Sequence, residues 1–372
     1  MKICFITPKY PGKHNQSDYA FVKQLVDAIA MLGNDCYVVC PYNILHYRKA
    51  SPIQLHYKVR NGNVWVFCPW YYSFSNKNKF LRRIGGISRQ HSLRKAFRML
   101  PFHPDAMYGH FWLSAYEGYD FAKKNNIPLF VASGESDISK LFTLPKDLNE
   151  FSKFVSGVIC VSSKNQDESI RLGLTSIEKC AVFPNAVNVE LFHKRDKIEC
   201  RRKIGLPQND FIVAFVGWFN ERKGPQRVAD AINMIGGVKS VFIGKGEQEP
   251  QCDGILFKGT LPHEEVPLYL GAADCFVLPT QAEGCCNAVV EAMACGLPII
   301  SSNLPFNWDV LDESNSIMVD PNSINEVADA IRVLRDNIVL REKLAIGALQ
   351  KAESLTIDQR AKAVASFIEA RI

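Results

Sequence analysis

A regular alternation constrains this chain more than any other feature of its sequence. Short apolar runs rich in β-branched residues alternate with longer segments of helical periodicity, and the series occurs twice along the 372 residues. Between the two series, around 183–192 and the basic segment 194–203, the alternation stops. Such alternation is typical of βαβ units that build parallel sheets, and a chain of this length exceeds one ordinary core. We therefore expect an α/β protein with two Rossmann-like, doubly wound domains.

The positions of the predicted elements follow from this periodicity. The first series predicts strands at Lys2–Thr7, Cys36–Cys40, Asn63–Phe67, Ala106–Gly109, Leu129–Ala132 and Gly157–Val161. The second series predicts strands at Phe211–Val216, Ser240–Ile243, Ile255–Phe257, Cys275–Leu278, Pro298–Ser301 and Ser316–Val319. We place the N-terminal domain at 1–187 and the C-terminal domain at 188–354, and we expect the helix at 355–372 to pack back on the first domain.

Composition and the N-terminal segment indicate the cellular compartment of the protein. Hydrophobic residues make up 47% of the chain and charged residues 22%, which is close to the average of folded soluble proteins. Pro8 and Pro11 interrupt the first apolar run too early for a signal peptide, and no run reaches the roughly 18 apolar residues of a membrane span. We therefore expect a cytoplasmic protein whose cysteines stay reduced. Cys36 and Cys40 have no second pair or nearby histidine to complete a zinc site, so we expect no bound metal.

Positive charge is concentrated in the first half. Residues 1–190 hold 24 Lys and Arg against 14 Asp and Glu, whereas residues 191–372 hold 20 against 24. No carboxylate occurs between Asp35 and Asp105, and eight Lys and Arg fall within 77–98 with apolar residues between them. This pattern favours a basic amphipathic surface for an anionic membrane or an anionic acceptor. A solvated helix pair with an incidental basic bias explains it equally well. We expect no nucleic-acid partner.

The segment Pro279–Ser302 is the richest in residues that carry chemistry. A buried strand ends there in a polar turn, after which a helix begins. Ligands of open α/β sheets bind beyond the carboxyl ends of the strands, so Glu283 should lie at the mouth of a site. Glu291, about one helical turn further along, can accept hydrogen bonds from vicinal ribose hydroxyls. Free backbone N–H groups at the helix start suit a diphosphate. They belong to Gly284, Cys285, Cys286 and Asn287.

Glu283 and Glu291, with seven residues between them in EG…NAVVEAMACGLP, closely resemble the signature of glycosyltransferase family 4. The resemblance runs through most of the chain and is strongest at 211–302. It implies the GT-B fold, in which two Rossmann-like domains face a central cleft. It also implies transfer of a sugar from a nucleotide diphosphate with retention of the anomeric configuration. Glu283 would then hold hydroxyls of the donor hexose, and Glu291 the donor ribose.

Glycine-rich loops in the second half complete the donor site that this resemblance implies. In FVGWFNERKGP, Lys223 would neutralise the diphosphate in place of a metal, with Gly217 leaving room for it. Members of the family usually carry an Arg where this chain has Trp218, and Arg222 would compensate. Backbone groups of two later loops would surround the nucleobase. They belong to Gly244, Lys258 and Leu261.

The resemblance also assigns residues of the first half to catalysis and to the acceptor. His110, at the end of a predicted strand, would hydrogen-bond the transferred sugar. The second His of the family is replaced by Gly134, so Glu135 and Asp137 would take over polar contacts with the acceptor. The acceptor side would be completed by the first loop, through Gly12 and Lys13.

These patterns predict a retaining hexosyltransferase that uses a nucleotide-diphosphate sugar and no cofactor. Its acceptor would be a glycan or a lipid-linked glycan, in cell-surface polysaccharide assembly at the inner face of the membrane. A dinucleotide-dependent oxidoreductase is disfavoured because no G-x-G-x-x-G turn follows the first strand. The alternative is a non-catalytic sugar-nucleotide- or lipid-binding relic of the same fold. Trp218 and Gly134 favour that alternative, whereas the intact Glu283, Glu291 and Lys223 oppose it.

Overall fold

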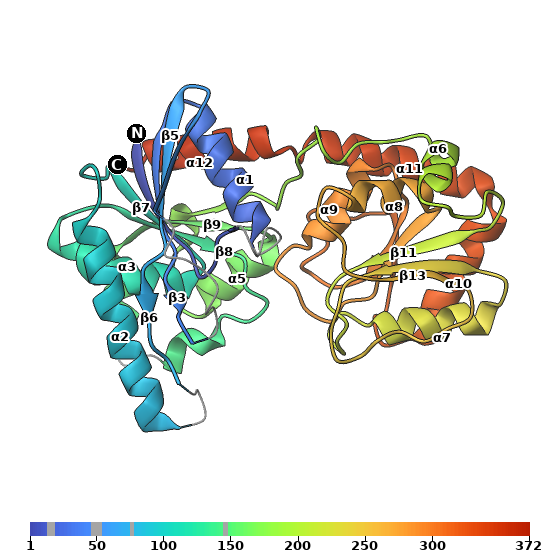
Figure 1. Ribbon diagram of the computed structural model, residues 1–372, viewed down its shortest axis with the longest axis horizontal. Coiled ribbons are helices and arrows are strands. Elements are labelled where there is room, and N and C mark those ends of the chain that lie inside the picture. The colour runs from blue at the N-terminus through green and yellow to red at the C-terminus, as the bar shows by residue number, and fades with distance from the viewer. Residues whose placement is uncertain (13–18, 46–53, 75–77, 144–147) are drawn as a thin grey trace. The chain divides into compact units, whose positions relative to one another are not determined.

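The chain divides into two compact units (Figure 1). Unit 1 comprises Met1–Phe183 together with Asp358–Ile372, and unit 2 comprises Pro184–Ile357. The domain boundaries predicted from the sequence lie close by, at 187/188 and 354/355. This computed structural model describes residues 1–12, 19–45, 54–74, 78–143 and 148–372.

Unit 1 is built on an eight-stranded sheet in the order β10-β9-β8-β7-β1-β2-β5-β4. Its strands are β1 (Lys2–Ile6), β2 (Asp35–Val39), β4 (Gln54–Val59), β5 (Gly62–Phe67), β7 (Ala106–His110), β8 (Leu129–Ser133), β9 (Val155–Cys160) and β10 (Cys180–Val182). All neighbours run parallel except the hairpin of β4 and β5. The short strands β3 (Tyr42–Asn43) and β6 (Trp70–Tyr71) form a separate parallel pair. The central strands are buried on both faces, as their continuous apolar runs predict.

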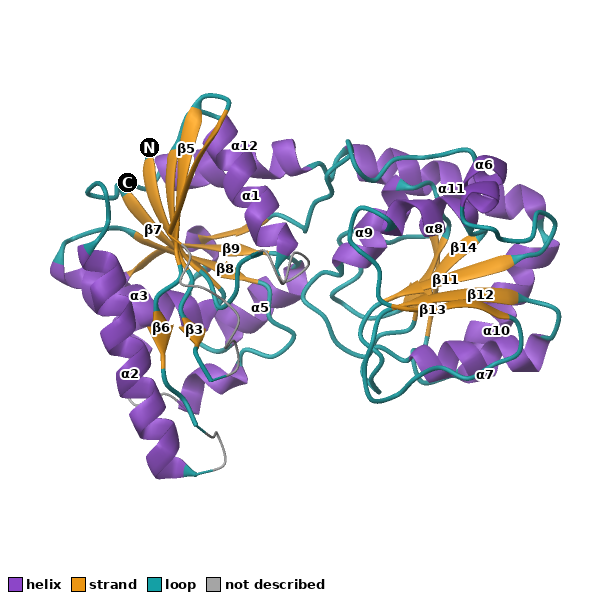
Figure 2. Cartoon of the chain, in the orientation of Figure 1, coloured by secondary structure: helices purple, strands orange, loops and turns teal. Residues whose placement is uncertain are grey.

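Helices cover both faces of this sheet (Figure 2). They are α1 (Ala20–Met31), α2 (Lys79–Arg98), α3 (Trp112–Lys124), α4 (Leu148–Phe154), α5 (Ser163–Arg171) and α12 (Ile357–Glu369), with the short 3₁₀ turns η1 (Ser139–Thr143) and η2 (Ile177–Lys179). Helix α1 buries Val22, Leu25 and Ile29, which recur at the spacing of one helical face. Helix α2 begins at the cap Asn78, whose side chain accepts hydrogen bonds from the first free N–H groups. The segment read as a possible helix pair is therefore one continuous helix.

Unit 2 contains a six-stranded, fully parallel sheet in the order β13-β12-β11-β14-β15-β16. Its strands are β11 (Ile212–Val216), β12 (Lys239–Ile243), β13 (Ile255–Gly259), β14 (Cys275–Leu278), β15 (Ile299–Ser302) and β16 (Ser316–Val319). Its helices are α6 (Lys197–Lys203), α7 (Pro225–Ile235), α8 (Val266–Ala272), α9 (Asn287–Ala294), α10 (Ile324–Asp336) and α11 (Ile338–Glu353). All six strands predicted from the sequence are present.

Each sheet has one point at which the direction of winding reverses. In unit 2 the chain proceeds from β11 outward to β12 and β13, then returns to place β14 on the other side of β11. In unit 1 it proceeds from β1 to β2 and later returns to place β7 beside β1. Loops leave such a pair of strands in opposite directions and open a crevice at their carboxyl ends, where ligands of doubly wound folds bind. The two reversals therefore locate one candidate half-site in each unit.

Candidate active site

The half-site of unit 2 is formed by two loops, 217–224 after β11 and 279–286 after β14. Backbone and side-chain hydrogen bonds tie these loops together. Gln281 N donates to the carbonyl of Arg222 at 2.8 Å, and Arg227 Nη2 donates to the carbonyl of Pro279 at 2.9 Å. The sequence analysis did not single out Arg227, which joins the two loops from the first turn of α7. The loops therefore form one structural unit at the carboxyl edge of the sheet.

Three predicted residues meet between these loops. Lys223 Nζ lies 2.6 Å from Glu283 Oε1, and Arg222 Nη1 contacts the same oxygen. Thr280 Oγ1 also donates to it at 3.2 Å. Lys223 is only 8% exposed, and burial by itself disfavours the ammonium. The charge and hydrogen bond of the Glu283 carboxylate oppose burial, and the pKa of Lys223 is raised above its ordinary value, so the side chain stays charged.

The start of α9 lies beside this cluster. Cys286 occupies the N-cap position without a side-chain cap, and its Sγ lies 3.6 Å from Lys223 Nζ. Burial raises the pKa of the Cys286 thiol, which therefore remains protonated and is no nucleophile at neutral pH. Asn287 Oδ1 is buried and has no hydrogen-bond partner among the described residues. Asn185 Nδ2 donates to the carbonyl of Cys285 at 2.8 Å and holds the turn that precedes the helix.

Glu291 has a partner that the sequence analysis did not identify. His263 Nε2 lies 3.0 Å from Glu291 Oε1, and its ring packs against Phe192 with centroids 5.0 Å apart. Burial opposes protonation, but the hydrogen bond and charge of Glu291 outweigh it and raise the pKa of His263. The signal was present in the sequence, because His263 falls in the loop after β13 that was assigned to the nucleotide.

The loops after β12 and β13 pack closely on the loop after β11. A Cβ at Gly244 would lie 1.9 Å from the carbonyl oxygen of Gly217, so a glycine is required at this backbone contact. Gly217 itself has ordinary room for a Cβ. Lys258 extends to Glu249, at 3.0 Å, and Leu261 is half-buried. These residues line the same carboxyl edge of the sheet as the ionic cluster.

Trp218 stands where the resembling family usually has an Arg. Its side chain is 57% exposed, and Lys245 Nζ lies 5.7 Å from the centre of its ring. A cation is therefore present near this position, although it comes from the loop after β12. Arg222, which the sequence analysis offered as a substitute, is paired with Glu283 and with the carbonyl of Ala282.

In unit 1, His110 is the last residue of β7 and lies at the reversal point beside β1. It is buried, with its ring against those of Phe21 at 5.3 Å and Phe111 at 4.7 Å. Burial and, to a lesser extent, the charge of Arg360 lower the pKa of His110 to about 3. Its Nδ1 has no hydrogen-bond partner among the described residues. His110 is thus a neutral imidazole with one unused ring nitrogen.

Backbone strain follows directly after His110. Phe111 has a φ of 80°, which is uncommon for a residue with a side chain and recurs at functional sites. The turn begins α3, and Glu135 Oε1 accepts a hydrogen bond from Trp112 N at 2.6 Å. Burial raises the pKa of Glu135 to about 7, although backbone hydrogen bonds oppose the shift. The carboxylate predicted to contact an acceptor thus also caps α3.

The other predicted acceptor residues are less closely grouped. Asp137 Oδ1 accepts hydrogen bonds from Ser139 N at 2.9 Å and Ser139 Oγ at 2.6 Å, at the start of η1. Gly12 is half-buried in the loop after β1. Lys13 lies outside the described residues. The described part of the chain contains no group of three His, Cys, Asp or Glu residues placed to hold a metal ion.

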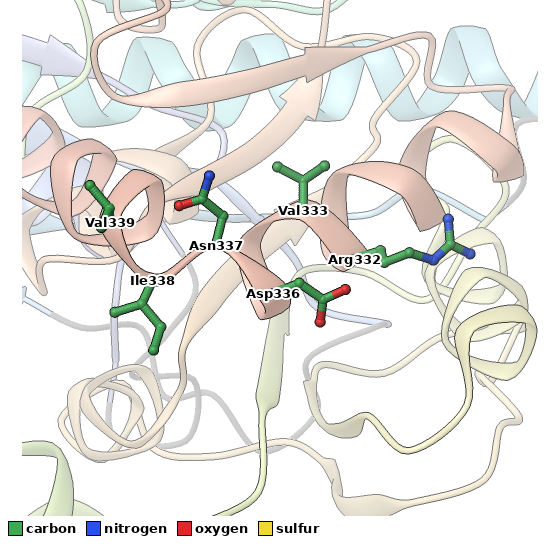
Figure 3. Close-up of a pocket in the computed structure, with 6 residues that line it drawn as sticks. All are labelled: Arg332, Val333, Asp336, Asn337, Ile338 and Val339. Atoms are coloured by element: carbon green, nitrogen blue, oxygen red, sulfur yellow. The ribbon is translucent and has the colours of Figure 1, made fainter.

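A surface depression of about 570 Å³ lies elsewhere in unit 2, at the junction of α10 and α11 (Figure 3). Its lining consists of Arg332, Val333, Asp336, Asn337, Ile338 and Val339. It contains none of the predicted site residues and lies apart from the carboxyl ends of the strands. We therefore do not connect it with the chemistry. Among the described helices, none combines the length and the apolar character that crossing a bilayer requires.

Comparison with known proteins agrees with this arrangement. Residues 196–350 match the model of the family described as glycosyl transferases group 1. A Bacillus subtilis (strain 168) protein, whose name assigns it to teichuronic acid biosynthesis as a glycosyltransferase, is 27% identical over 89% of this chain and 88% of its own length. The Escherichia coli UDP-Gal:alpha-D-GlcNAc-diphosphoundecaprenol alpha-1,3-galactosyltransferase is 31% identical over 50% of this chain and 53% of its own.

The fold is also shared with a solved structure. Anabaena Alr3699/HepE, in complex with UDP and glucose, matches with a TM-score of 0.74 over 100% of both chains at 17% identity. At that identity the likeness establishes the fold, and membership of family 4 in particular stays a prediction. The family model, the relatives and the shared fold together identify this chain as a glycosyltransferase of the GT-B fold, related through residues 196–350 to the group 1 enzymes.

Proposed function

We propose that the chain transfers a hexose from a nucleoside-diphosphate sugar to a hydroxyl of a lipid-linked glycan, with retention of configuration, in cell-surface polysaccharide assembly. The observation that carries this proposal is the cluster of Lys223, Arg222 and Glu283 at the reversal point of unit 2. Two cations and one carboxylate leave one net positive charge there, beside the uncapped start of α9. This combination suits a diphosphate.

Different residues of this half-site contact different parts of the donor. Lys223 and the backbone N–H groups around Cys286 and Asn287 hold the diphosphate. When the donor binds, Glu283 gives up part of its contact with Lys223 and Arg222 and accepts hydrogen bonds from hydroxyls of the hexose. Glu291 accepts hydrogen bonds from the ribose hydroxyls, and His263 fixes the orientation of its carboxylate from 3.0 Å.

The reaction needs no further acid or base from the protein. The acceptor oxygen bonds to the anomeric carbon from the face that the leaving group occupies, while the bond from that carbon to the diphosphate oxygen breaks. The acceptor's proton passes to the departing diphosphate oxygen. Lys223, kept charged in its buried position, stabilises the negative charge that develops on the diphosphate. No metal ion takes part in this scheme.

Unit 1 contributes the acceptor-side residues. His110, with its pKa near 3, remains neutral and acts as a hydrogen-bonding group toward the transferred sugar rather than as a general base. Gly12, Lys13, Glu135 and Asp137 are proposed to lie around the acceptor. The names of two similar proteins mention UDP, one of them with an undecaprenol-linked acceptor, so we take uridine diphosphate and a polyprenyl-diphosphate-linked glycan as the first candidates. The cytoplasmic face of the membrane is the corresponding location.

The test is release of UDP from a panel of UDP-hexoses, with and without a polyprenyl-diphosphate-linked sugar acceptor, in excess EDTA. We expect acceptor-dependent turnover that EDTA leaves unchanged and that Glu283→Gln reduces by about 10²-fold or more. A protein that binds UDP without releasing it from any donor would be the non-catalytic relic. Complete, reversible loss of turnover in EDTA would instead require a metal.

A further inference from the structure

One line of residues on α2 faces outward along the whole helix. Phe80, Ile84, Ile87, His91, Arg94 and Arg98 follow one another at intervals of four or three residues, and all are exposed. Such spacing places them on one face, opposite the buried residues Leu93, Ala96 and Phe97. The outward line is apolar in its first half and basic in its second. Phe80 is 70% exposed and Ile87 63%, which is unusual for side chains of this size.

A second row of exposed side chains lies beside α2. Trp70, Tyr72 and Phe74 alternate along an extended segment, so they share one side of it. Their rings form a continuous row, with centroids 5.2 Å apart between the first two and 6.4 Å between the last two. All three are exposed, at 45%, 41% and 58%. This row is a second exposed apolar area, beside α2.

Specific contacts fix the aromatic row against the helix. Tyr72 N donates to Ser88 Oγ at 3.0 Å, and the Arg89 guanidinium lies 5.0 Å from the centre of the Tyr71 ring. A Cβ at Gly85 would lie 2.7 Å from Ser73 Oγ, so Gly85 lets the segment approach α2 closely. Figure 1 shows β6 running alongside α2, whose N-terminal end projects from unit 1. The segment with the aromatic row therefore lies against α2, and we call the exposed residues of the helix and of this segment together the α2 face.

The charge of the α2 face is of one sign. Arg82, Arg83, Arg94, Lys95 and Arg98 are exposed, and none forms an ion pair among the described residues. Arg89 differs, because Glu117 binds it in a bidentate pair. No Asp or Glu occurs in the sequence between Asp35 and Asp105. The face therefore combines unpaired cations with exposed Trp, Tyr, Phe and Ile.

We infer that the α2 face binds the surface of an anionic bilayer. Tryptophan and tyrosine prefer the interface between headgroups and acyl chains, and basic residues beside them are attracted to anionic lipids. Phe80, Ile84 and Ile87 insert shallowly, while Arg94, Lys95 and Arg98 contact headgroups. A nucleic acid would use the cations but not the exposed isoleucines. The inference deepens the proposed function, since it places the enzyme where a lipid-linked acceptor resides.

The experiment is co-sedimentation with vesicles of phosphatidylglycerol and phosphatidylethanolamine, compared with phosphatidylcholine vesicles. Wild type should bind the anionic vesicles at low salt and dissociate at about 0.5 M salt, where the Debye length falls below about 5 Å. Combining Arg82→Gln, Arg83→Gln, Arg94→Gln and Lys95→Gln should weaken binding about 10²-fold or more. The matched control changes Lys58, Lys124, Lys153 and Arg171, four exposed basic residues of unit 1, to Gln and should bind within about twofold of wild type.

A second variant and a second readout separate bilayer insertion from charge alone. Replacing Phe80 and Ile87 by Ser should weaken vesicle binding about tenfold while leaving the melting temperature unchanged, because these two side chains are largely exposed. Brominated lipids should quench tryptophan fluorescence of wild type more than that of Trp70→Phe. Both multiple variants should turn over a lipid-free acceptor at the wild-type rate, so a failed proposed function and a failed bilayer assignment give different results.

Several results would overturn the inference. Wild type could ignore anionic vesicles at low salt, or bind neutral vesicles equally well. The Ser variant could convert a wild-type dimer to a monomer, which would make the α2 face a protein interface. Loss of turnover on the lipid-free acceptor in the Gln variant would make the cations part of an acceptor site instead.

Discussion

The two units share one topological feature but differ in the chemistry of the residues placed there. Each places a reversal point at the carboxyl edge of a parallel sheet, and each puts a predicted catalytic residue there. In unit 2 this edge carries paired charges, with Lys223 and Arg222 on Glu283 and His263 on Glu291. In unit 1 His110 lies instead among aromatic rings, and none of the described residues is a hydrogen-bond partner of its Nδ1.

This difference explains why the site residues of unit 2 are easier to recognise in the sequence than those of unit 1. A diphosphate and a ribose demand cations, carboxylates and amides at fixed positions, and the family match at 196–350 falls within unit 2. Acceptors vary among enzymes that share a donor, so loops on the acceptor side are free to change. The charge also differs, since the basic surplus lies in the first half of the chain. The comparison predicts that unit 2 variants affect the nucleotide and unit 1 variants affect the acceptor.

The largest effect is expected for Lys223→Ala. Removing a buried cation from the developing charge of the leaving diphosphate should lower kcat/KM by about 10³-fold. Glu283 keeps Arg222 and Thr280 as partners, so the fold should survive. Steady-state kinetics and a melting curve provide the measurement, with the exposed Lys203→Ala of α6 as the matched control. Near-normal turnover in Lys223→Ala would remove the ionic cluster from the mechanism.

A smaller effect, about 10- to 10²-fold on kcat, is expected for His110→Ala. Affinity for UDP should stay within about twofold of wild type, because His110 belongs to unit 1. The pKa of His110 is near 3, so the imidazole does not titrate between pH 5 and 8. The pH profile of the remaining activity should therefore keep the shape of wild type. A profile that loses an ionisation near neutrality would show that His110 acts as a base.

Glu291→Ala should weaken UDP binding by about tenfold or more, as expected for loss of a hydrogen bond to a charged group. His263→Ala should act in the same direction but more weakly, because it acts through Glu291. With 2′,3′-dideoxyuridine diphosphate, which lacks the ribose hydroxyls, both variants should bind like wild type. Calorimetric titration measures all six affinities. A penalty that persists with the dideoxy nucleotide would place Glu291 elsewhere than at the ribose.

The smallest effect concerns pH and stability. The pKa of His263 is raised in the folded state by Glu291, so the stabilisation is complete below the ordinary value of about 6.5 and is lost as pH rises through the folded pKa. Glu264 contributes in the same direction. His263→Gln cannot protonate. Its melting temperature should therefore fall below that of wild type at pH 6 and approach it at pH 9. A difference that is constant over this range would contradict the assignment.

Most of the sheet was predictable because buried parallel strands are continuous apolar runs. The ends of the predicted strands differ from the observed ends by one or two residues. Strand β4 was missed because it is an antiparallel edge with exposed positions such as Leu55, and its pattern lacks that continuity. The basic stretch 77–98 was also interpreted as a possible helix pair, but it forms one helix, Lys79–Arg98. Within this helix Gly85 packs against Ser73, a contact between segments that the sequence does not reveal.

The same distinction applies to the site, where some residues were predicted and others depend on contacts between distant segments. Lys223 was predicted from the resemblance to glycosyltransferase family 4 and Glu283 from its place after a buried strand, and the structure brings them to 2.6 Å. His263 and Arg227 were missed because their roles depend on partners far along the chain, Glu291 and the carbonyl of Pro279. Glu135 was predicted from the family resemblance, as a substitute for the second His that Gly134 replaces, and its hydrogen bond with Trp112 N could not be read from the sequence. Contacts between side chains of different loops can be identified only once the fold is known.

The most direct measurement is a calorimetric titration of UDP into wild type, Lys223→Ala, Glu291→Ala and His110→Ala. We expect wild type to bind UDP without added metal, both unit 2 variants to lose at least about tenfold in affinity, and His110→Ala to bind like wild type. Unchanged UDP affinity in Lys223→Ala and Glu291→Ala, together with loss of binding in His110→Ala, would contradict this assignment, because the nucleotide would then lie in unit 1.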